Sequence, residues 1–97
     1  MDILKTLEGL VSAFGPSGCE HEISQVIEKL AAPFVDGISR DVMGNLICRK
    51  KGNGPRVMFS AHMDSIGLVA THIDEKGFVH VGALGGVNAA RALYTPV

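Results

Sequence analysis

The sequence predicts an α/β fold in which two amino-terminal helices precede a series of short strands. Apolar residues recur at helical spacing over residues 3–30. The chain then changes to short apolar runs separated by glycine-bearing turns, and one of these runs leads directly into His62 and Asp64. We expect the helices and first strands to form one α/β unit, and the later strands to begin a small β-rich unit.

The first helix is predicted from apolar residues that share one face: Ile3, Leu4, Leu7, Leu10, Val11 and Phe14. Asp2 is placed to cap its amino terminus, and Gly15 with Pro16 ends it. We expect the apolar stripe of this helix to pack into the core.

A second helix is predicted to begin at the capping-box pattern formed by Ser17 and Glu20 and to end at Pro33. His21 lies in its first turn, where we expect a solvated side chain. Its apolar face, also expected in the core, consists of Ile23, Val26, Ile27 and Leu30.

A β-hairpin is predicted next, with strands over residues 37–42 and 45–50 around a tight turn at Met43 and Gly44. The charged and glycine-bearing segment 50–55 that follows is expected to be an exposed loop.

The run Arg56–Ala61 predicts a buried central strand, because strands covered on both faces are continuously apolar. Side chains two positions apart share one face of a strand, so His62 and Asp64 are expected to converge at its carboxyl end. A neutral imidazole is a common zinc ligand, and a carboxylate at its other nitrogen fixes its tautomer. The alternative is structural: His62 is a hydrogen-bonded strand-end histidine and Asp64 opens a turn.

Residues beyond Asp64 predict a second hairpin, with strands 66–73 and 78–81 around the loop 74–77. Glycines then bend the chain, which is typical of a small β-barrel. His72 and His80 are expected to face each other across this hairpin, but a metal site there is disfavoured because no third ligand is evident.

Composition narrows the class of protein. The chain is 46% hydrophobic and 20% charged with a net charge of −1, which suggests neither a nucleic-acid nor an anionic-membrane partner. No apolar run reaches transmembrane length, and the amino terminus is not a signal peptide. Cys19 and Cys48 are expected to be free thiols of a cytoplasmic protein, with Cys48 a small core residue and no cysteine–zinc site.

Five motifs in order give the chain a family resemblance: Gly15–Glu20, Asp41–Ile47, Phe59–Gly67, Ile73–Phe78 and Gly85-Gly86. From Ile3 to Val97 the chain resembles the amino-terminal part of the glutamyl aminopeptidase/cellulase-M family of dinuclear metallo-aminopeptidases. One departure is Ser65, where the family often has Glu.

The resemblance implies two domains. Residues 1–66 would be the amino-terminal part of a peptidase-type α/β sandwich, and residues 67–97 the beginning of an inserted, truncated β-barrel domain. The chain therefore looks like a fragment, and its last residues, 92–97, read as the start of a strand.

The resemblance also assigns roles. His62 would bind one of two divalent metal ions, zinc or cobalt, and Asp64, the candidate catalytic residue, would orient that histidine. The remaining ligands and the catalytic base would lie downstream, so the fragment alone should be inactive and bind no metal ion or one weakly. The other acidic residues considered are explained as turn and cap residues: Glu20, Asp41, Asp74 and Glu75.

By the same resemblance, the complete protein would be a cytoplasmic hydrolase that removes amino-terminal residues from peptides. Its partners would be the peptide substrate, the remainder of the enzyme and further copies of itself in a large hollow homo-oligomer. The label endoglucanase also attaches to the family, but no pair of acidic residues suited to glycoside hydrolysis is apparent. The alternative is a non-catalytic module that self-associates or binds peptides through the open β edges after Ser65.

Overall fold

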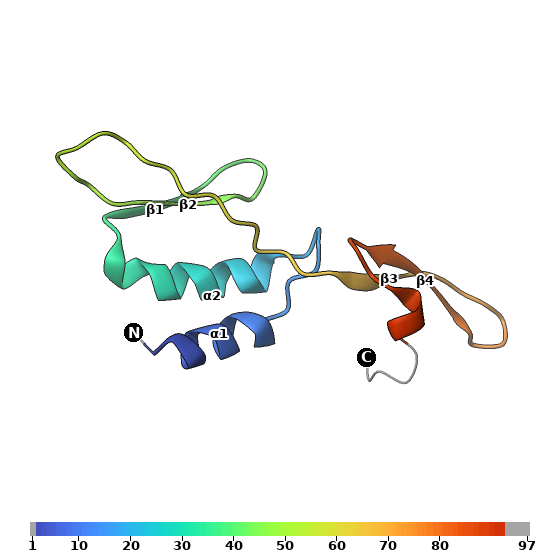
Figure 1. Cartoon of the computed structure of the whole chain (residues 1–97). Helices are drawn as coiled ribbons and strands as arrows, with labels where there is room; N and C mark the ends of the chain where they lie inside the picture. Colours follow the sequence, from blue (N-terminus) through green and yellow to red (C-terminus); the bar gives the residue numbers. More distant parts are fainter. Residues whose placement is uncertain (1, 93–97) are drawn as a thin grey trace.

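A computed structural model describes residues 2–92 and contains two helices followed by two antiparallel hairpins (Figure 1). The order of the two helices and the two hairpins agrees with the sequence-based prediction, but the strand predicted between the hairpins is absent from the described residues. The helices are α1 (Ile3–Ser12) and α2 (His21–Ala31), with short 3-10 helices η1 (Ala32–Phe34) and η2 (Ala89–Arg91). The hairpins are β1 (Gly37–Arg40) with β2 (Leu46–Arg49), and β3 (Gly67–Ile73) with β4 (Val79–Leu84).

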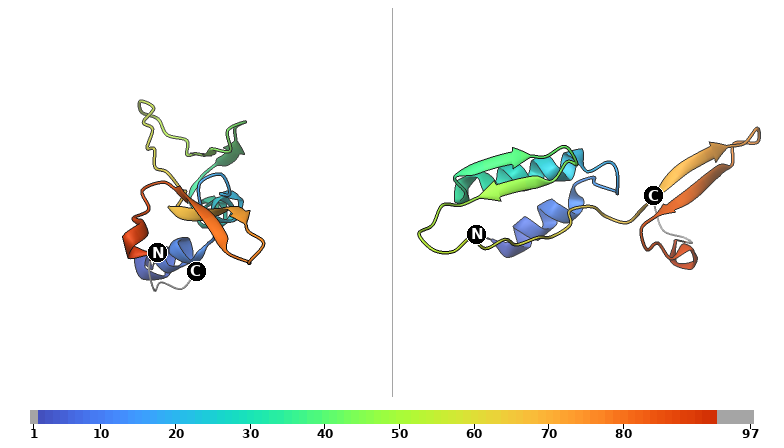
Figure 2. Two further views of the ribbon diagram at one scale, coloured as in Figure 1. Left: turned by 90° about the vertical axis from the view of Figure 1, so that its right-hand side faces the viewer. Right: turned by 90° about the horizontal axis from the view of Figure 1, so that it is seen from above.

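The chain is elongated. Helix α2 lies between α1 and the β1–β2 hairpin, while the β3–β4 hairpin extends away from these elements (Figures 1 and 2). The radius of gyration is 17.6 Å, whereas a compact domain of this length has about 12.5 Å. The accessible surface is 8567 Å², against about 5,300 Å² expected for a folded monomer of this size. Much apolar surface is therefore left uncovered.

The amino-terminal cap of α1 is confirmed, because the Asp2 carboxylate accepts hydrogen bonds from the N–H groups of Leu4 and Lys5. The chain then passes closely over α2 at Gly15. A Cβ atom at Gly15 would lie 2.3 Å from Cγ2 of Ile23, so only glycine fits there. Among the described residues, Ile23 is the one buried hydrophobic side chain.

The predicted capping box is wrong. Glu20 occupies the N-cap position of α2 but makes no side-chain capping bond, and its carboxylate instead accepts the N–H of Gly18. The Ser17 hydroxyl donates to Asp64, which is distant in the sequence. The Ser17 hydroxyl therefore makes a tertiary hydrogen bond and does not form the cap of α2 that the local sequence pattern predicts.

The expectation that both apolar stripes lie in a core is also wrong for most positions. No residue of α1 is buried, and Leu4 and Val11 are 78% and 81% exposed. Helix α2 buries Ile23 and Ser24, while Cys48, expected in the core, is exposed. Helix α2 contacts both α1 and β2, but these contacts leave most apolar side chains of the two helices exposed or half-buried.

Two hairpin turns have the same construction and confirm the predicted positions. In each, an aspartate carboxylate accepts two backbone N–H groups, and the aspartate carbonyl accepts the N–H of a glycine three residues on. The aspartates are Asp41 and Asp74, and the glycines, Gly44 and Gly77, both have φ of 85°. A three-residue loop ending in a left-handed glycine matches the twist of the strands.

The first turn carries one additional contact. Nδ2 of Asn45 donates to the Asp41 carboxylate at 2.8 Å. This side-chain hydrogen bond, helped by backbone N–H groups and opposed by desolvation, lowers the pKa of Asp41 below its usual 3.8. Because the pKa of Asp41 is lower in the folded chain, the contact stabilises the turn fully at pH values above the usual pKa of 3.8. This stabilisation is lost as the pH falls through the lower pKa of the folded chain.

The buried central strand predicted at Arg56–Ala61 is wrong for this chain. The segment forms no strand, and Val57, Met58 and Phe59 are 74%, 87% and 95% exposed. It runs as an extended trace between β2 and β3 (Figure 2). The described residues form only two separate two-stranded sheets, so no neighbouring strand is present to bind its backbone or cover its faces.

The second hairpin is confirmed, with a register irregularity between Ala70 and His72. His72 pairs with His80, and their ring centroids are 5.4 Å apart. No closed barrel forms among residues 2–92, and the strand expected over 92–97 lies outside the described residues apart from its first position. The inserted barrel therefore stays a prediction.

Calorimetry tests the small core. We expect the isolated 97-residue chain to bind a dye for exposed apolar surface and to unfold without a sharp heat-absorption peak. A compact domain of this length would absorb about 70 kcal/mol at its midpoint. A cooperative peak of that size would contradict the exposed stripes described above.

Gly44→Ala tests the first turn. We expect it to destabilise the β1–β2 hairpin by about 1–2 kcal/mol, because alanine adopts positive φ at that cost. The matched control is Gly52→Ala, which has equally open surroundings and no positive φ, and should change stability by less than about 0.5 kcal/mol. Amide-exchange protection of the cross-strand N–H groups measures both, and equal effects would contradict the turn assignment.

Candidate functional site

His62 and Asp64 are brought together as expected, although not by a strand. Nδ1 of the His62 ring lies 3.0 Å from Oδ1 of Asp64 and 3.1 Å from its carbonyl oxygen. With Nδ1–H donating to these oxygens, Nε2 is the nitrogen that can bind a metal ion. The imidazole ring is 86% exposed and the Asp64 side chain 36% exposed.

The second oxygen of Asp64 has a partner that sequence reasoning missed. Oγ of Ser17 donates to Oδ2 of Asp64 at 2.5 Å, across 47 positions of sequence. The pKa of Asp64 is lowered below its usual value, mainly by the Ser17 hydrogen bond and next by the His62 contact. Desolvation has a smaller, opposite effect. Ser17 lies in the Gly15–Glu20 motif, but the local sequence pattern predicts that its side chain caps the helix.

Backbone contacts dock the Ser17 loop against the segment that carries Asp64. The Ser65 N–H donates to the Gly15 carbonyl at 2.8 Å, and the Ser17 N–H donates to the Ser65 carbonyl at 3.3 Å. Pro16 and Ser65 thereby form a parallel β-bridge. A Cβ at Gly67 would lie 3.2 Å from Cβ of Pro16, so the two segments pack tightly beyond the bridge.

The described residues fit one ligand of a metal site. Within residues 2–92, no three His, Cys, Asp or Glu side chains are placed to hold a metal ion together. His72 and His80 contact each other but gather no third ligand in this part of the chain. Asp41 and Asp74 are turn residues, as expected. Structural zinc needs four protein ligands and catalytic zinc usually three. The His62 imidazole alone is therefore not enough, among the described residues, to complete either kind of site.

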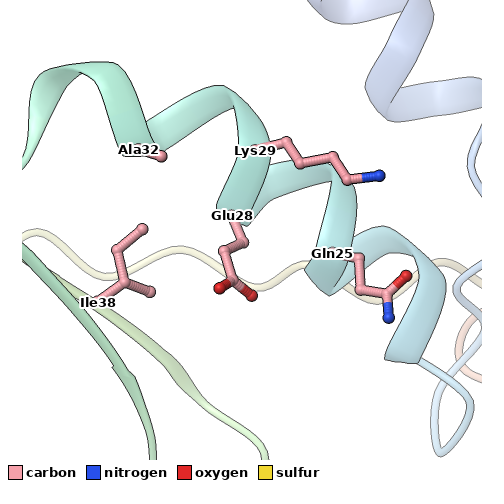
Figure 3. Close-up of a pocket in the computed structure, with 5 residues that line it drawn as sticks. All are labelled: Gln25, Glu28, Lys29, Ala32 and Ile38. Atoms are coloured by element: carbon pink, nitrogen blue, oxygen red, sulfur yellow. The ribbon is translucent and has the colours of Figure 1, made fainter.

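A shallow hollow lies between α2 and β1, away from this pair (Figure 3). The Glu28 side chain points toward β1, the strand that contains Ile38. It forms an ion pair with Arg40 of the same strand. Neither His62 nor Asp64 lines the hollow. The residues that line it are Gln25, Glu28, Lys29, Ala32 and Ile38. Over the described residues, neither helix is long and apolar enough to cross a membrane.

Comparison with known proteins gives consistent matches. The chain is 47% identical over 87 residues to a putative aminopeptidase of Acetivibrio thermocellus, which covers 90% of this chain and 26% of that protein. It is 38% identical over 82 residues to the lysyl aminopeptidase of Pyrococcus furiosus, covering 84% and 24%. The crystal structure of a TET aminopeptidase from the archaeon Thaumarchaeota archaeon SCGC AB-539-E09 superposes with a TM-score of 0.80 at 31% identity, covering 86% and 23%.

These relatives define the class of protein as aminopeptidase-like, with the mixed helix–strand arrangement of the TET enzyme. The sequence profile described as M42 glutamyl aminopeptidase matches residues 44–97. The chain belongs to this family, which confirms the resemblance identified from the motifs. It spans about a quarter of the length of the relatives that it matches.

Metal titration of the isolated chain tests the single-ligand assignment. We expect zinc and cobalt to bind too weakly to compete with an indicator of micromolar affinity, because one imidazole replaces the usual three or four protein ligands. His62→Ala should remove the residual binding, and the chain should release no amino acid from peptides. Stoichiometric binding in competition with the indicator would contradict the assignment.

Proposed function

We propose that this chain is the amino-terminal part of a metal-dependent aminopeptidase that removes residues from the amino termini of peptides. The observation that carries the proposal is the contact between His62 Nδ1 and the Asp64 carboxylate, in a chain of the M42 family. This contact leaves Nε2 on an exposed ring, as a metal ligand requires. The similarity to a putative aminopeptidase and to a lysyl aminopeptidase supports the same reaction class.

In this proposal His62 binds one of two divalent metal ions, zinc or cobalt, and Asp64 holds its tautomer and raises its basicity. When bound, the metal ions supply Lewis-acid activation of water. The other ligands and the catalytic base lie in a part of the enzyme that corresponds to the unmatched three quarters of the relatives. The isolated chain lacks that chemistry and is inactive.

The exposed apolar surface supports a larger protein. The stripe of α1 and the side chains of 57–59 are uncovered, and together they expose large hydrophobic residues that stable domains bury. We infer that the rest of the enzyme covers these faces and that Arg56–Ala61 then pairs with neighbouring strands. A cytoplasmic homo-oligomer is part of the proposal, supported by the similarity to a TET aminopeptidase and by the free cysteines Cys19 and Cys48.

The alternative function is a non-catalytic module that self-associates or binds peptides. The open edges of the two-stranded sheet β3–β4 favour it, since unpaired edges accept further strands. It gives no reason, however, for a carboxylate held between His62 and Ser17. The sequence following Val97 in the parent gene discriminates the two, because further acidic residues and a histidine would complete the metal site.

Two substitutions in the full-length protein test the enzyme proposal. We expect His62→Ala to abolish most activity, because it removes a metal ligand. Asp64→Asn should lower activity or metal affinity about 10- to 100-fold without unfolding the protein, because it only weakens the orientation of that ligand. Aminopeptidase assays on both variants, with bound metal measured, provide the readout.

The matched control is His72→Ala, which removes an exposed imidazole from β3. It should keep wild-type turnover and metal content. If Asp64→Asn also keeps full turnover and full metal occupancy, the orienting role is wrong and Asp64 is a turn residue. If His62→Ala keeps both, the proposed function of this site is wrong.

A further inference from the structure

We propose that Ser17 is a positioning residue for the metal-binding imidazole of His62 and acts through the Asp64 carboxylate. The inference rests on the proposed function, because it assumes that His62 binds a metal ion. It assigns a role to the loop Gly15–Glu20, which neither helix packing nor the proposed ligand set explains.

The Asp64 carboxylate is shared between two hydrogen-bond partners. Oδ1 faces Nδ1 of His62 at 3.0 Å, and Oδ2 accepts the Ser17 hydroxyl at 2.5 Å. The terminal torsion of an aspartate side chain is broad and roughly two-fold, so one hydrogen bond leaves its plane poorly determined. A second bond on the other oxygen selects one orientation. The direction in which the carboxylate receives the imidazole N–H is therefore set by Ser17.

Ser17 is itself held in place by backbone contacts. The bridge between Pro16 and Ser65 fixes its backbone beside Asp64. A tight turn follows, in which Gly18 has φ of 87° and the Cys19 N–H donates to the Pro16 carbonyl at 2.8 Å. These contacts make the serine a fixed donor, as a supporting group for a functional side chain must be.

The loop that contains Ser17 packs against α2. Gly15 packs directly on Ile23, the buried hydrophobic residue of α2, and the Gly15 carbonyl accepts the Ser65 N–H at 2.8 Å. The contacts of His62 with Asp64 and of Asp64 with Ser17 thus connect the imidazole to the loop that packs on α2. This matters because the segment 56–64 has no strand pairing of its own among the described residues.

The alternative role of Ser17 is an ordinary helix cap. Its hydroxyl would then bind an N–H group at the start of α2, but it donates to Asp64 instead. A cap would stabilise the helix and leave metal affinity unchanged. The two roles therefore differ in a measurable quantity.

The experiment measures zinc affinity of the full-length protein by competition with a chromogenic chelator, together with kcat and the thermal midpoint. We expect Ser17→Ala to weaken zinc binding about 10-fold, the lower end of the range for groups that orient a ligand. Ser17→Thr keeps the hydroxyl and should restore most of the affinity. The matched control is Ser39→Ala, an exposed serine of β1, which should bind zinc like the wild type.

A double-mutant cycle separates positioning from general stabilisation. If Ser17 acts through Asp64, Ser17→Ala should have no further effect on zinc affinity in an Asp64→Ala background. A purely structural serine would instead lower stability in both backgrounds by the same amount and leave zinc affinity unchanged in each.

The results that overturn the inference are distinct from those that overturn the proposed function. Wild-type zinc affinity in a folded Ser17→Ala variant, or additive effects in the cycle, would overturn the role of Ser17 while loss of zinc in His62→Ala still supported the metal site. Should Ser17→Ala fail to fold, the comparison of Ser17→Thr with Ser17→Val decides, since valine is close in shape to threonine but has no hydroxyl donor. The Ser17→Val variant should then bind zinc less tightly than the Ser17→Thr variant. Unchanged zinc binding in His62→Ala would overturn the proposed function itself.

Discussion

The Asp64 carboxylate, shared between His62 and Ser17, is the contact on which the candidate site depends. Each partner contacts a different oxygen, and the partners lie 47 and 2 positions before Asp64 in the sequence. The contact joins the first loop of the chain to the segment that leads into the second hairpin. It is reinforced by the backbone bridge between Pro16 and Ser65. Without this junction, the exposed segment before His62 would have few constraints on its direction.

The small hydrophobic core explains why the junction between the Ser17 loop and Asp64 matters for the fold. Hydrophobic burial, the dominant favourable term in folding, is nearly confined to Ile23 among residues 2–92. Hydrogen-bonded turns and one docked loop therefore organise the chain more than a core does. Such an arrangement suits a piece of a larger α/β protein, whose helices bury their apolar faces on a sheet formed by the whole sequence. The relatives are about four times longer than this chain, which is long enough for such a sheet.

The two hairpin turns show what local sequence determines well. An aspartate followed three positions later by a glycine builds the same loop at Asp41 and at Asp74, from hydrogen bonds within five residues. The Asp2 cap is equally local. These features were predicted because their partners lie within one turn of chain, so the pattern of residue types contains the whole interaction.

Sequence alone thus determined the order of helices and hairpins, their turns, the family and the pairing of His62 with Asp64, which are only two positions apart. The tertiary structure decided what depends on partners far along the chain. Ser17 bonds Asp64 rather than a helix end, because the docked loop brings its hydroxyl beside that carboxylate. Arg56–Ala61 is an exposed extended segment rather than a strand, because a strand exists only when a neighbour takes up its backbone hydrogen bonds.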